Sequence, residues 1–284
     1  MKNFYSPLRY PGGKARVSEY FKQVFRDNLL YDGTYIEPYT GGGAVALALL
    51  FNEYASKIII NDKDIALYAF WYSIINDTDN FLKKINDTKI DLKNWEIQKQ
   101  IHTEKENQEI LDVGFSTFFL NRTNRSGILK AGIIGGKEQS GQWKMDARFN
   151  KKDLMNRIEK IALFKSKIKL YNLDALELIK RVKYSTDEKA LFYFDPPYYV
   201  KGKDLYMNYY NHDDHEKLAK AINKISKQKW IVSYDDVEPI QQNYRMFRQK
   251  KFQLDYSAGN NNKKGNEVMI FSNNLFISEF DKFI

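Results

Sequence analysis

The chain has 284 residues, which is long enough for one large domain or for a domain with a sizeable insertion. It carries 45 Lys and Arg against 36 Asp and Glu, a formal net charge of +9, and this balance favours a polyanionic partner. The sequence contains no cysteine, which excludes disulfides, thiolate metal sites and a cysteine nucleophile, and its three histidines are too scattered for a convincing zinc site.

No segment of the sequence is suited to membrane insertion. Its longest apolar run, Ala44 to Phe51, is far too short to span a bilayer. The amino terminus carries Pro7, Pro11, Gly12 and Gly13 where a signal peptide would need an apolar stretch. We therefore expect a soluble, cytoplasmic protein with no membrane partner.

Four short apolar runs, each ending in an acid, predict the first strands of the fold. The acids are Glu37, Asp62, Asp174 and Asp195. Helical patterns follow the first three runs at residues 45–54, 65–75 and 175–182, and further along come a helix at 215–226 and strands at 230–234, 252–256 and 267–271. Strands that alternate with helices predict an α/β fold with a doubly wound, mostly parallel sheet.

These acids are expected to meet at one edge of the sheet. In a doubly wound sheet, ligands bind beyond the carboxyl ends of the strands. A single acid at such a place is ordinary, because Asp is a common N-cap for the next helix. Four of them beside a glycine loop predict a site built for hydroxyls and a positive charge.

Residues 77–165 interrupt the alternation of strands and helices. The span is rich in Lys, Asn, Gln and Arg, and it is typical of a mainly helical insertion with a glycine-studded loop. We therefore assign residues 1–76 and 166–284 to one domain and residues 77–165 to an inserted domain. A polar basic loop with Lys263 and Lys264 lies between the last two strands.

The stretch at residues 192–198, Phe-Tyr-Phe-Asp-Pro-Pro-Tyr, is the most informative about chemistry. The strand must stop at Asp195, because Pro196 and Pro197 have no N–H for a ladder and have a fixed φ. A carboxylate, free backbone carbonyls and the ring of Tyr198 then lie at one edge, and that combination suits a flat ring that bears an amino group. The structural alternative is a strand end followed by a Pro-Pro turn with a surface tyrosine.

The segment Glu37 to Gly43, Glu-Pro-Tyr-Thr-Gly-Gly-Gly, follows the first strand and opens a helix. Asp62 comes 19 residues after Gly43, the spacing at which a carboxylate hydrogen-bonds a ribose in dinucleotide-binding folds. However, Ala46 stands in place of the third glycine of that pattern, and Glu37 would repel a pyrophosphate. A nucleoside without phosphates and with a cationic group fits better, which points to S-adenosylmethionine (SAM). A tight strand-to-helix turn with an acidic surface is the plainer interpretation.

An early element, Tyr10-Pro-Gly-Gly-Lys14, is not a phosphate-binding P-loop, because its Lys lacks the upstream glycine spacing and is followed by Ala15. With the other motifs it resembles the Dam-type (D12 class) DNA adenine-N6 methyltransferases. The motifs occur in the family's order from residue 8 to about residue 271; they are Tyr10–Lys14, Glu37–Gly43, Asp62, Asn121-Arg122, Gly127, Asp174, Asp195–Tyr198 and Glu267. The resemblance implies a Rossmann-like, seven-stranded, SAM-dependent catalytic domain whose insertion is a target-recognition domain.

The resemblance also assigns roles around the methionine end of SAM. Tyr10 and Lys14 would contact that end of the cofactor. Gly41 and Gly43 would line it, and Glu37 would lie near its amino group.

Further roles follow for the rest of the cofactor and for the target base. Asp62 would bind the ribose of SAM, and Asp174 its adenine amino group. Asp195 would serve both the cofactor pocket and the target base, accepting the amino hydrogens with the carbonyl of Pro196 while Tyr198 stacks on the base. The reaction implied is methyl transfer from SAM to N6 of a flipped-out adenine in duplex DNA, with no metal required.

Polar residues of the insertion and of the late basic loop are candidate DNA contacts. They are Arg122, Asn124, Arg125, Lys130, Arg148, Lys263 and Lys264. The charged ones are individually also explained as solvated surface residues. The segment after Asn121-Arg122 departs from the motif of enzymes that read GATC, so no recognition sequence follows. Whether a cognate restriction endonuclease is a partner stays open.

Three other functions use similar residues. A protein-glutamine methyltransferase carries Asn before the two prolines, where this chain has Asp195. An RNA adenine-N6 methyltransferase would need the same chemistry as a DNA enzyme. A catalytically inactive DNA-binding relative would lose the acid or the glycines, yet Asp195, Tyr198, Gly41 and Gly43 are all present.

Overall fold

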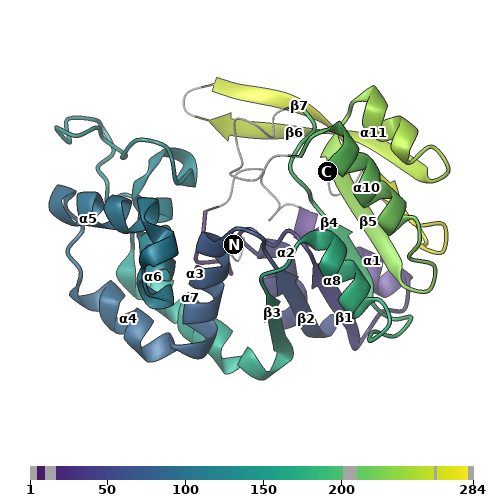
Figure 1. Ribbon diagram of the computed structural model, residues 1–284, viewed down its shortest axis with the longest axis horizontal. Coiled ribbons are helices and arrows are strands. Elements are labelled where there is room, and N and C mark those ends of the chain that lie inside the picture. The colour runs from purple at the N-terminus through teal and green to yellow at the C-terminus, as the bar shows by residue number, and fades with distance from the viewer. Residues whose placement is uncertain (1–4, 10–16, 201–209, 259–260, 281–284) are drawn as a thin grey trace. The chain divides into compact units, whose positions relative to one another are not determined.

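The computed structural model describes residues 5–9, 17–200, 210–258 and 261–280, without the side chains of residues 254–264 (Figure 1). The predicted cofactor residues Tyr10 and Lys14 therefore lie outside the described residues, as do the side chains of Lys263 and Lys264. The chain forms two compact units. One comprises Met1–Pro11, Ile65–Ser166 and Ala258–Asn260, and the other comprises Gly12–Asp64, Lys167–Ser257 and Asn261–Ile284.

Seven strands form one sheet, which confirms the predicted fold class. In sheet order they are β3 (Ile168–Tyr171), β2 (Ala55–Asn61), β1 (Gly33–Glu37), β4 (Leu191–Phe194), β5 (Lys229–Asp235), β7 (Asn261–Phe271) and β6 (Arg248–Ala258). The first five are parallel to one another, and β7 runs antiparallel to β5. The order reverses on either side of β1, and such switch points are where open α/β sheets bind ligands.

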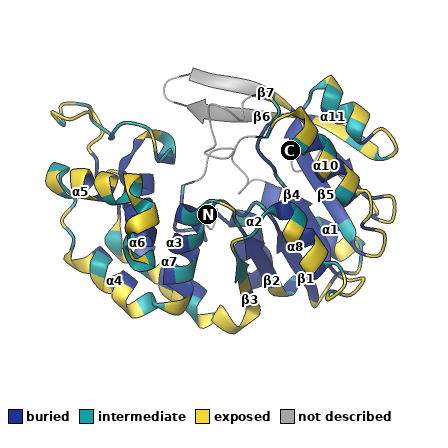
Figure 2. Cartoon of the chain, in the orientation of Figure 1, coloured by how far each residue is buried: buried dark blue, intermediate teal, exposed yellow. Residues whose placement is uncertain are grey.

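Alternate residues of the central strands cover two faces of the sheet. Phe192 and Phe194 of β4 pack in one core with α8 (Ala175–Val182), α10 (His212–Ile222) and α11 (Glu238–Asn243). Tyr193, between them, lies on the other face, where its ring centroid is 4.6 Å from that of Phe21 in α1 (Val17–Asp27). The central strands β1, β4 and β5 are accordingly buried almost throughout, while the outer surfaces of the helices are exposed (Figure 2). The sequence patterns missed α1.

The helix after β1, α2 (Ala44–Phe51), is apolar on all sides, and residues 45–50 are all buried. It begins one residue before the predicted helix and ends three residues earlier.

The other unit is helical in its described part. Its helices are α3 (Ile65–Asn76), α4 (Thr78–Asp87), α5 (Leu92–Thr103), α6 (Ile110–Thr123) and α7 (Lys151–Leu163), with short 3₁₀ turns at Lys105–Asn107 and Arg125–Gly127. Helix α6 lies at its centre, since residues 113–123 are all buried. Phe118 of α6 stacks on Phe70 of α3 and meets Phe81 of α4 edge-on.

The main segment of this unit begins at Ile65, whereas the sequence analysis placed the start of the inserted domain at residue 77. Helix α3 packs tightly on α6, because Gly114 lets the two backbones approach. A Cβ at Gly114 would lie 2.5 Å from the carbonyl oxygen of Ala69. The role of this unit in target recognition stays a prediction.

Candidate active site

The four predicted strand-end acids follow four neighbouring strands. In sheet order they are Asp174 after β3, Asp62 after β2, Glu37 at the end of β1 and Asp195 after β4. Glu37 is buried, while the other three are partly exposed. The sheet thus brings four carboxyl groups to one edge.

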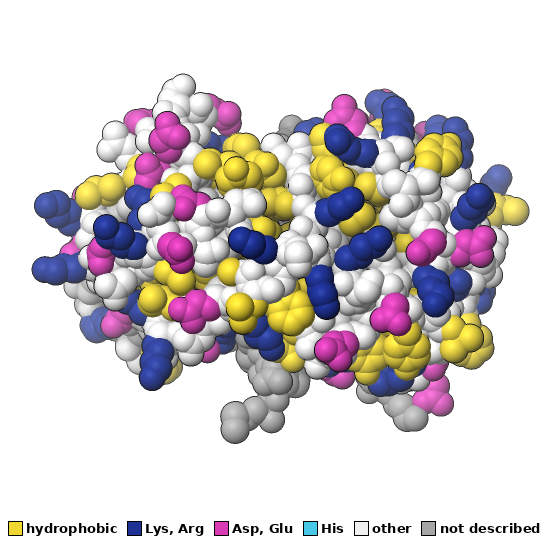
Figure 3. Space-filling view, turned by 90° about the horizontal axis from the view of Figure 1, so that it is seen from below, with side chains coloured by type: hydrophobic (Ala, Val, Ile, Leu, Met, Phe, Trp, Pro, Cys, Tyr) yellow, Lys and Arg dark blue, Asp and Glu magenta, His cyan; other side chains and the backbone are white. Residues whose placement is uncertain are grey.

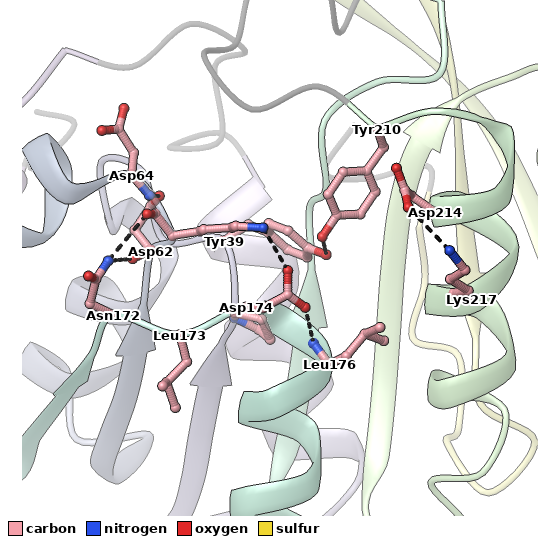
Figure 4. A network of polar contacts seen from close by, with 12 residues as sticks. Tyr39, Asp62, Asp64, Asn172, Leu173, Asp174, Leu176, Tyr210, Asp214 and Lys217 are labelled. Atoms are coloured by element: carbon pink, nitrogen blue, oxygen red, sulfur yellow. Dashed lines mark hydrogen bonds and ion pairs between the residues drawn. The ribbon is translucent and has the colours of Figure 1, made fainter.

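The glycine loop between β1 and α2 adopts a backbone that only glycine accepts readily. Gly41 has φ 48° and Gly43, the N-cap of α2, has φ 60°. The loop is fastened to the next strand by Asp62, whose Oδ2 accepts a hydrogen bond of 2.9 Å from the Gly41 N–H. Its Oδ1 accepts another of 3.0 Å from the Asp64 N–H. The Asp62 carboxylate is therefore fixed in orientation (Figure 4).

The environment of Asp62 opposes its ionisation. Burial raises the pKa of Asp62 from 3.8 to about 7, and the negative charge of Asp64 adds to the rise. The two backbone N–H donors act in the opposite direction but do not offset burial. Asp62 consequently changes charge near neutral pH.

A buried Asn that is not among the predicted site residues joins three loops at this edge. Asn61 Nδ2 donates to the carbonyl oxygens of Pro38 (2.9 Å) and Leu173 (3.0 Å), and its Oδ1 accepts from the Leu173 N–H (2.9 Å). Thr40 Oγ1 accepts from the Asn61 N–H and donates to the Glu37 carbonyl. The signal in the sequence was a polar residue directly after three isoleucines.

Asp174 serves as the N-cap of α8. One carboxyl oxygen accepts a 3.0 Å hydrogen bond from the Leu176 N–H, and the other lies 3.0 Å from Lys63 Nζ. The side chain is 30% exposed, so a ligand can still reach it.

Beyond these acids, aromatic side chains gather around a buried histidine. The hydroxyls of Tyr39 and Tyr210 are 2.9 Å apart (Figure 4). The rings of Tyr210 and Tyr199 lie 5.5 Å and 5.1 Å from the ring of His215. Burial lowers the pKa of His215 to about 4, so its imidazole is neutral at pH 7. The cluster offers apolar walls rather than an acid or base.

Asp195 is oriented by the neighbouring strand. Ser233 of β5 donates a 2.8 Å hydrogen bond from Oγ to Asp195 Oδ1, and the Tyr193 hydroxyl lies 2.9 Å from the same Oγ. Sequence patterns could not find Ser233, because a buried serine in an apolar strand carries no functional signal.

The residues after Asp195 are held by two further carboxylates. Tyr198 is only 4% exposed, and its hydroxyl donates a 2.5 Å hydrogen bond to Glu267 Oε1 of β7. Asp235 accepts from the N–H groups of Tyr199 (2.8 Å) and Val200 (2.9 Å). In the sequence, only the family resemblance points to Glu267. No pattern singled out Asp235, although β5 also ends in an acid after an apolar run.

In the helical unit, the Asn121-Arg122 pair anchors the segment that precedes Tyr10. Asn121 accepts from the Arg9 N–H (2.7 Å) and donates to the Arg9 carbonyl (2.7 Å), while Arg122 Nε donates to the Pro7 carbonyl (2.7 Å). Arg122 is buried, which together with nearby Arg157 and Arg9 lowers its pKa to about 9.

Two of the predicted DNA contacts are thus turned into the protein. Arg122 holds the backbone of Pro7, and Asn124 is buried and accepts a 2.7 Å hydrogen bond from Trp95 Nε1. Arg125, Lys130 and Arg148 are exposed. On the face seen in Figure 3, Lys and Arg side chains are scattered among Asp and Glu rather than gathered in one stripe.

Within the described residues, no group of three or more His, Asp or Glu side chains could hold a metal ion. No helix of that part of the chain is long and apolar enough to cross a membrane.

Residues 10–257 match the sequence profile of the family described as D12 class N6 adenine-specific DNA methyltransferase. The chain belongs to this family. The protein therefore transfers a methyl group to N6 of adenine in DNA and uses SAM as the methyl donor.

The chain is also similar to individual known proteins. It is 24% identical over 238 residues to the type II methyltransferase M.MjaIII of Methanocaldococcus jannaschii, covering 78% of this chain and 80% of that protein. A putative RNA methyltransferase from Pyrococcus horikoshii aligns with a TM-score of 0.46 and 9% identity, over 94% of this chain and 87% of that one. A SAM-dependent methyltransferase from Agrobacterium tumefaciens aligns with a TM-score of 0.41 and 7% identity, over 90% and 61%.

Proposed function

We propose that Asp195 and the carbonyl of Pro196 accept the two hydrogens of the target adenine amino group. An adenine amino nitrogen is a poor nucleophile, because its lone pair is delocalised into the ring. Two acceptors hold this nitrogen toward sp³ geometry and aim its lone pair at the methyl group of SAM. The N6–CH₃ bond would form as the S–CH₃ bond of SAM breaks, which leaves a neutral thioether, and the methylated amino group would then release one proton to solvent.

The observation that carries this proposal is the fixed orientation of Asp195. Ser233 Oγ donates to its Oδ1 from the adjacent strand, so the carboxylate is held before any base arrives. Asp195 also follows β4, the direct neighbour of β1, whose end carries the glycine loop. Alignment of nucleophile, methyl group and sulfur then supplies much of the rate.

The residues along the sheet edge fit the cofactor assigned to the family. SAM presents ribose hydroxyls, an amino group on its adenine and an ammonium and sulfonium charge, and acids suit all of these groups. We assign the ribose to Asp62, the adenine amino group to Asp174, and the methionine amino group to Glu37. The left-handed conformations of Gly41 and Gly43 allow the backbone to approach the cofactor closely.

For the DNA we propose a duplex whose target adenine is flipped out of the stack. Unstacking costs a few kcal/mol, which contacts with the extruded base offset. We assign stacking on that base to the ring of Tyr198, whose hydroxyl is tethered by Glu267. The residue is only 4% exposed, so its ring would have to be uncovered when the base enters. Of the insertion's predicted contacts, the proposal keeps the exposed Arg125, Lys130 and Arg148.

A cognate restriction endonuclease as partner is a further part of the proposal. It is supported by the similarity to a type II methyltransferase alone. A DNA substrate is consistent with the cytoplasmic location expected from the sequence, which stays a prediction.

The test compares the wild-type protein, Asp195→Ala and Asp213→Ala, an exposed acid of α10, with methyl-labelled SAM and unmethylated DNA. We expect label in N6-methyladenine for the wild type and for Asp213→Ala, and none for Asp195→Ala, with SAM binding by calorimetry unchanged in Asp213→Ala and still measurable in Asp195→Ala. Full activity of Asp195→Ala would rule out the mechanism. Transfer to RNA but not to DNA would redirect the substrate assignment.

A further inference from the structure

One tryptophan of the chain is exposed. All four tryptophans lie in the described part of the structure; Trp71, Trp95 and Trp230 are 0%, 5% and 1% exposed, whereas Trp143 is 60% exposed. A large aromatic side chain gains free energy by leaving water, so an exposed tryptophan on a well-defined loop is informative.

The loop that carries Trp143 is built around Gln139. Its Nε2 donates to the carbonyl of Ile134 (2.8 Å), and its Oε1 accepts from the N–H of Met145 (2.9 Å). The side-chain amide of Gln139 therefore connects the segment before Trp143, at Ile134, to the segment after it, at Met145. A Cβ at Gly135, which has φ 84°, would lie 2.7 Å from the carbonyl oxygen of Trp143, so the arms cross closely. Internal hydrogen bonds fix this loop, while the indole itself stays in solvent.

The surroundings of Trp143 are basic. The guanidinium carbon of Arg148 lies 5.8 Å from the centroid of the indole. Between residues 124 and 149 the sequence has five cationic and two acidic side chains; they are Arg125, Lys130, Lys137, Lys144 and Arg148 against Glu138 and Asp146. All seven are exposed. An exposed aromatic ring among cations is the combination with which proteins bind nucleic acid bases and phosphates together.

We propose that Trp143 stacks on a DNA base that is unstacked in the bound duplex, while Arg148 and its basic neighbours contact phosphates. The inference rests on the proposed function, because flipping one nucleotide leaves other bases without a stacking partner. Aromatic stacking tolerates any base, since every base has a π-face. Trp143 therefore adds affinity for the distorted duplex and does not choose the sequence.

Intrinsic fluorescence can report on Trp143 directly, because the other three tryptophans are buried. Acrylamide is expected to quench the free protein mainly through Trp143. Saturating duplex DNA is expected to protect it from acrylamide. Heparin supplies the charge of DNA without bases, so it is expected to bind without that protection. In Trp143→Phe the acrylamide-sensitive signal and its response to DNA should both be lost.

Affinity gives a second readout. We expect Trp143→Ala to weaken duplex binding about tenfold, and Trp143→Phe to weaken it less, since a ring remains. Tyr184→Ala is the matched control: Tyr184 is 85% exposed with Lys183 Nζ 4.6 Å from its ring centroid, yet it follows α8 in the other unit. It should bind DNA as the wild type does. Thermal unfolding establishes that each variant is folded.

Equal protection by heparin and by DNA would overturn the proposal, as would wild-type affinity in folded Trp143→Ala. The proposed mechanism fails separately, through full methyl transfer by Asp195→Ala. That variant keeps Trp143, so its DNA-dependent protection from acrylamide is expected to match the wild type whether or not the mechanism holds.

Discussion

Asp235 of β5 and Glu267 of β7 lie directly opposite each other in the antiparallel strand pair, and both hold the chain that follows Asp195. Glu267 receives the hydroxyl of Tyr198, and Asp235 receives the N–H groups of Tyr199 and Val200. A one-residue shift of β7 would turn Glu267 to the other face of the sheet. The register of the one antiparallel pair described for β5 thus fixes the aromatic ring proposed to meet the target base.

Loss of the Glu267 contact should impair both stability and catalysis. Glu267→Ala leaves the buried Tyr198 hydroxyl without its acceptor, which costs about 1–3 kcal/mol of unfolding free energy. A displaced ring should lower kcat by about ten- to a hundredfold with SAM affinity unchanged. If the two residues act through this one hydrogen bond, Glu267→Ala combined with Tyr198→Phe should lose no more activity than the worse single variant. Additive losses in this double-mutant cycle would contradict the coupling.

Asp235→Asn tests the second carboxylate. The amide can accept only one of the two backbone hydrogen bonds, and its NH₂ group would then face the other donor. We expect single-turnover methyl transfer to slow about tenfold while SAM affinity by calorimetry stays unchanged. Asp236→Asn is the control, because Asp236 bonds Gln241 and Lys251 instead. Equal effects of the two substitutions would mean that Asp235 has no positioning role.

The sheet and its acidic edge could be predicted because a buried strand requires a run of apolar residues, which is visible in the sequence. An apolar run followed by an acid marks where a buried strand reaches solvent, and all four such acids follow neighbouring strands in the structure. No comparable sequence pattern indicates that β7 pairs with β5 in the antiparallel direction. Pairing partners far apart in sequence cannot be read from the composition of either strand, so the contact between Tyr198 and Glu267 was out of reach.

Charge alone misled the interpretation of Arg122. A cationic residue in a basic insertion is usually solvated, and no local pattern marks the rare one that is buried. Helix α6 is buried on all sides, so its last turn has no solvent face, and Arg122 instead reaches a backbone carbonyl at Pro7. Burial of this kind depends on tertiary packing.

The raised pKa of Asp62 predicts a pH-dependent affinity for SAM. Ribose hydroxyls donate to the ionised carboxylate, so binding should tighten as pH rises through about 7, by about tenfold between pH 6 and pH 8. Asp62→Asn should abolish this dependence. Asp64→Asn removes the neighbouring negative charge, and it should move the profile to lower pH.

Without SAM, the same group should act on stability in the opposite direction. Its folded pKa exceeds the ordinary 3.8, so ionisation opposes folding, and the free energy of unfolding should fall as pH rises from 3.8 to about 7. Titration calorimetry and thermal unfolding across this window measure both effects. If the SAM affinity of the wild-type protein does not change with pH, Asp62 does not bind the ribose.

Asn61→Asp should damage the cofactor loops more than its small change in size suggests. The substitution replaces a donor to two carbonyl oxygens with an acceptor, in a residue that is 1% exposed. We expect a loss of about 2–4 kcal/mol in unfolding free energy, together with weakened SAM binding. Asn172→Asp is the matched control, since Asn172 Nδ2 also donates to a carbonyl, that of Asp62, but the residue is exposed. A larger loss in Asn172→Asp would contradict the role given to burial.

Arg122 and Arg125 lie three residues apart, but replacement by Gln should affect different properties: stability at Arg122 and DNA binding at Arg125. Arg122→Gln removes the buried donor to the Pro7 carbonyl and should lower the unfolding free energy by about 2–3 kcal/mol. Arg125→Gln should leave the melting temperature unchanged, because the residue is exposed, but it should weaken DNA binding and reduce the slope of log K against log salt by about 1. Thermal melts and DNA binding across a salt series measure the two effects separately. If Arg122→Gln kept the wild-type melting temperature and lost the salt slope, Arg122 would be the phosphate contact and its burial would not describe the DNA-bound enzyme.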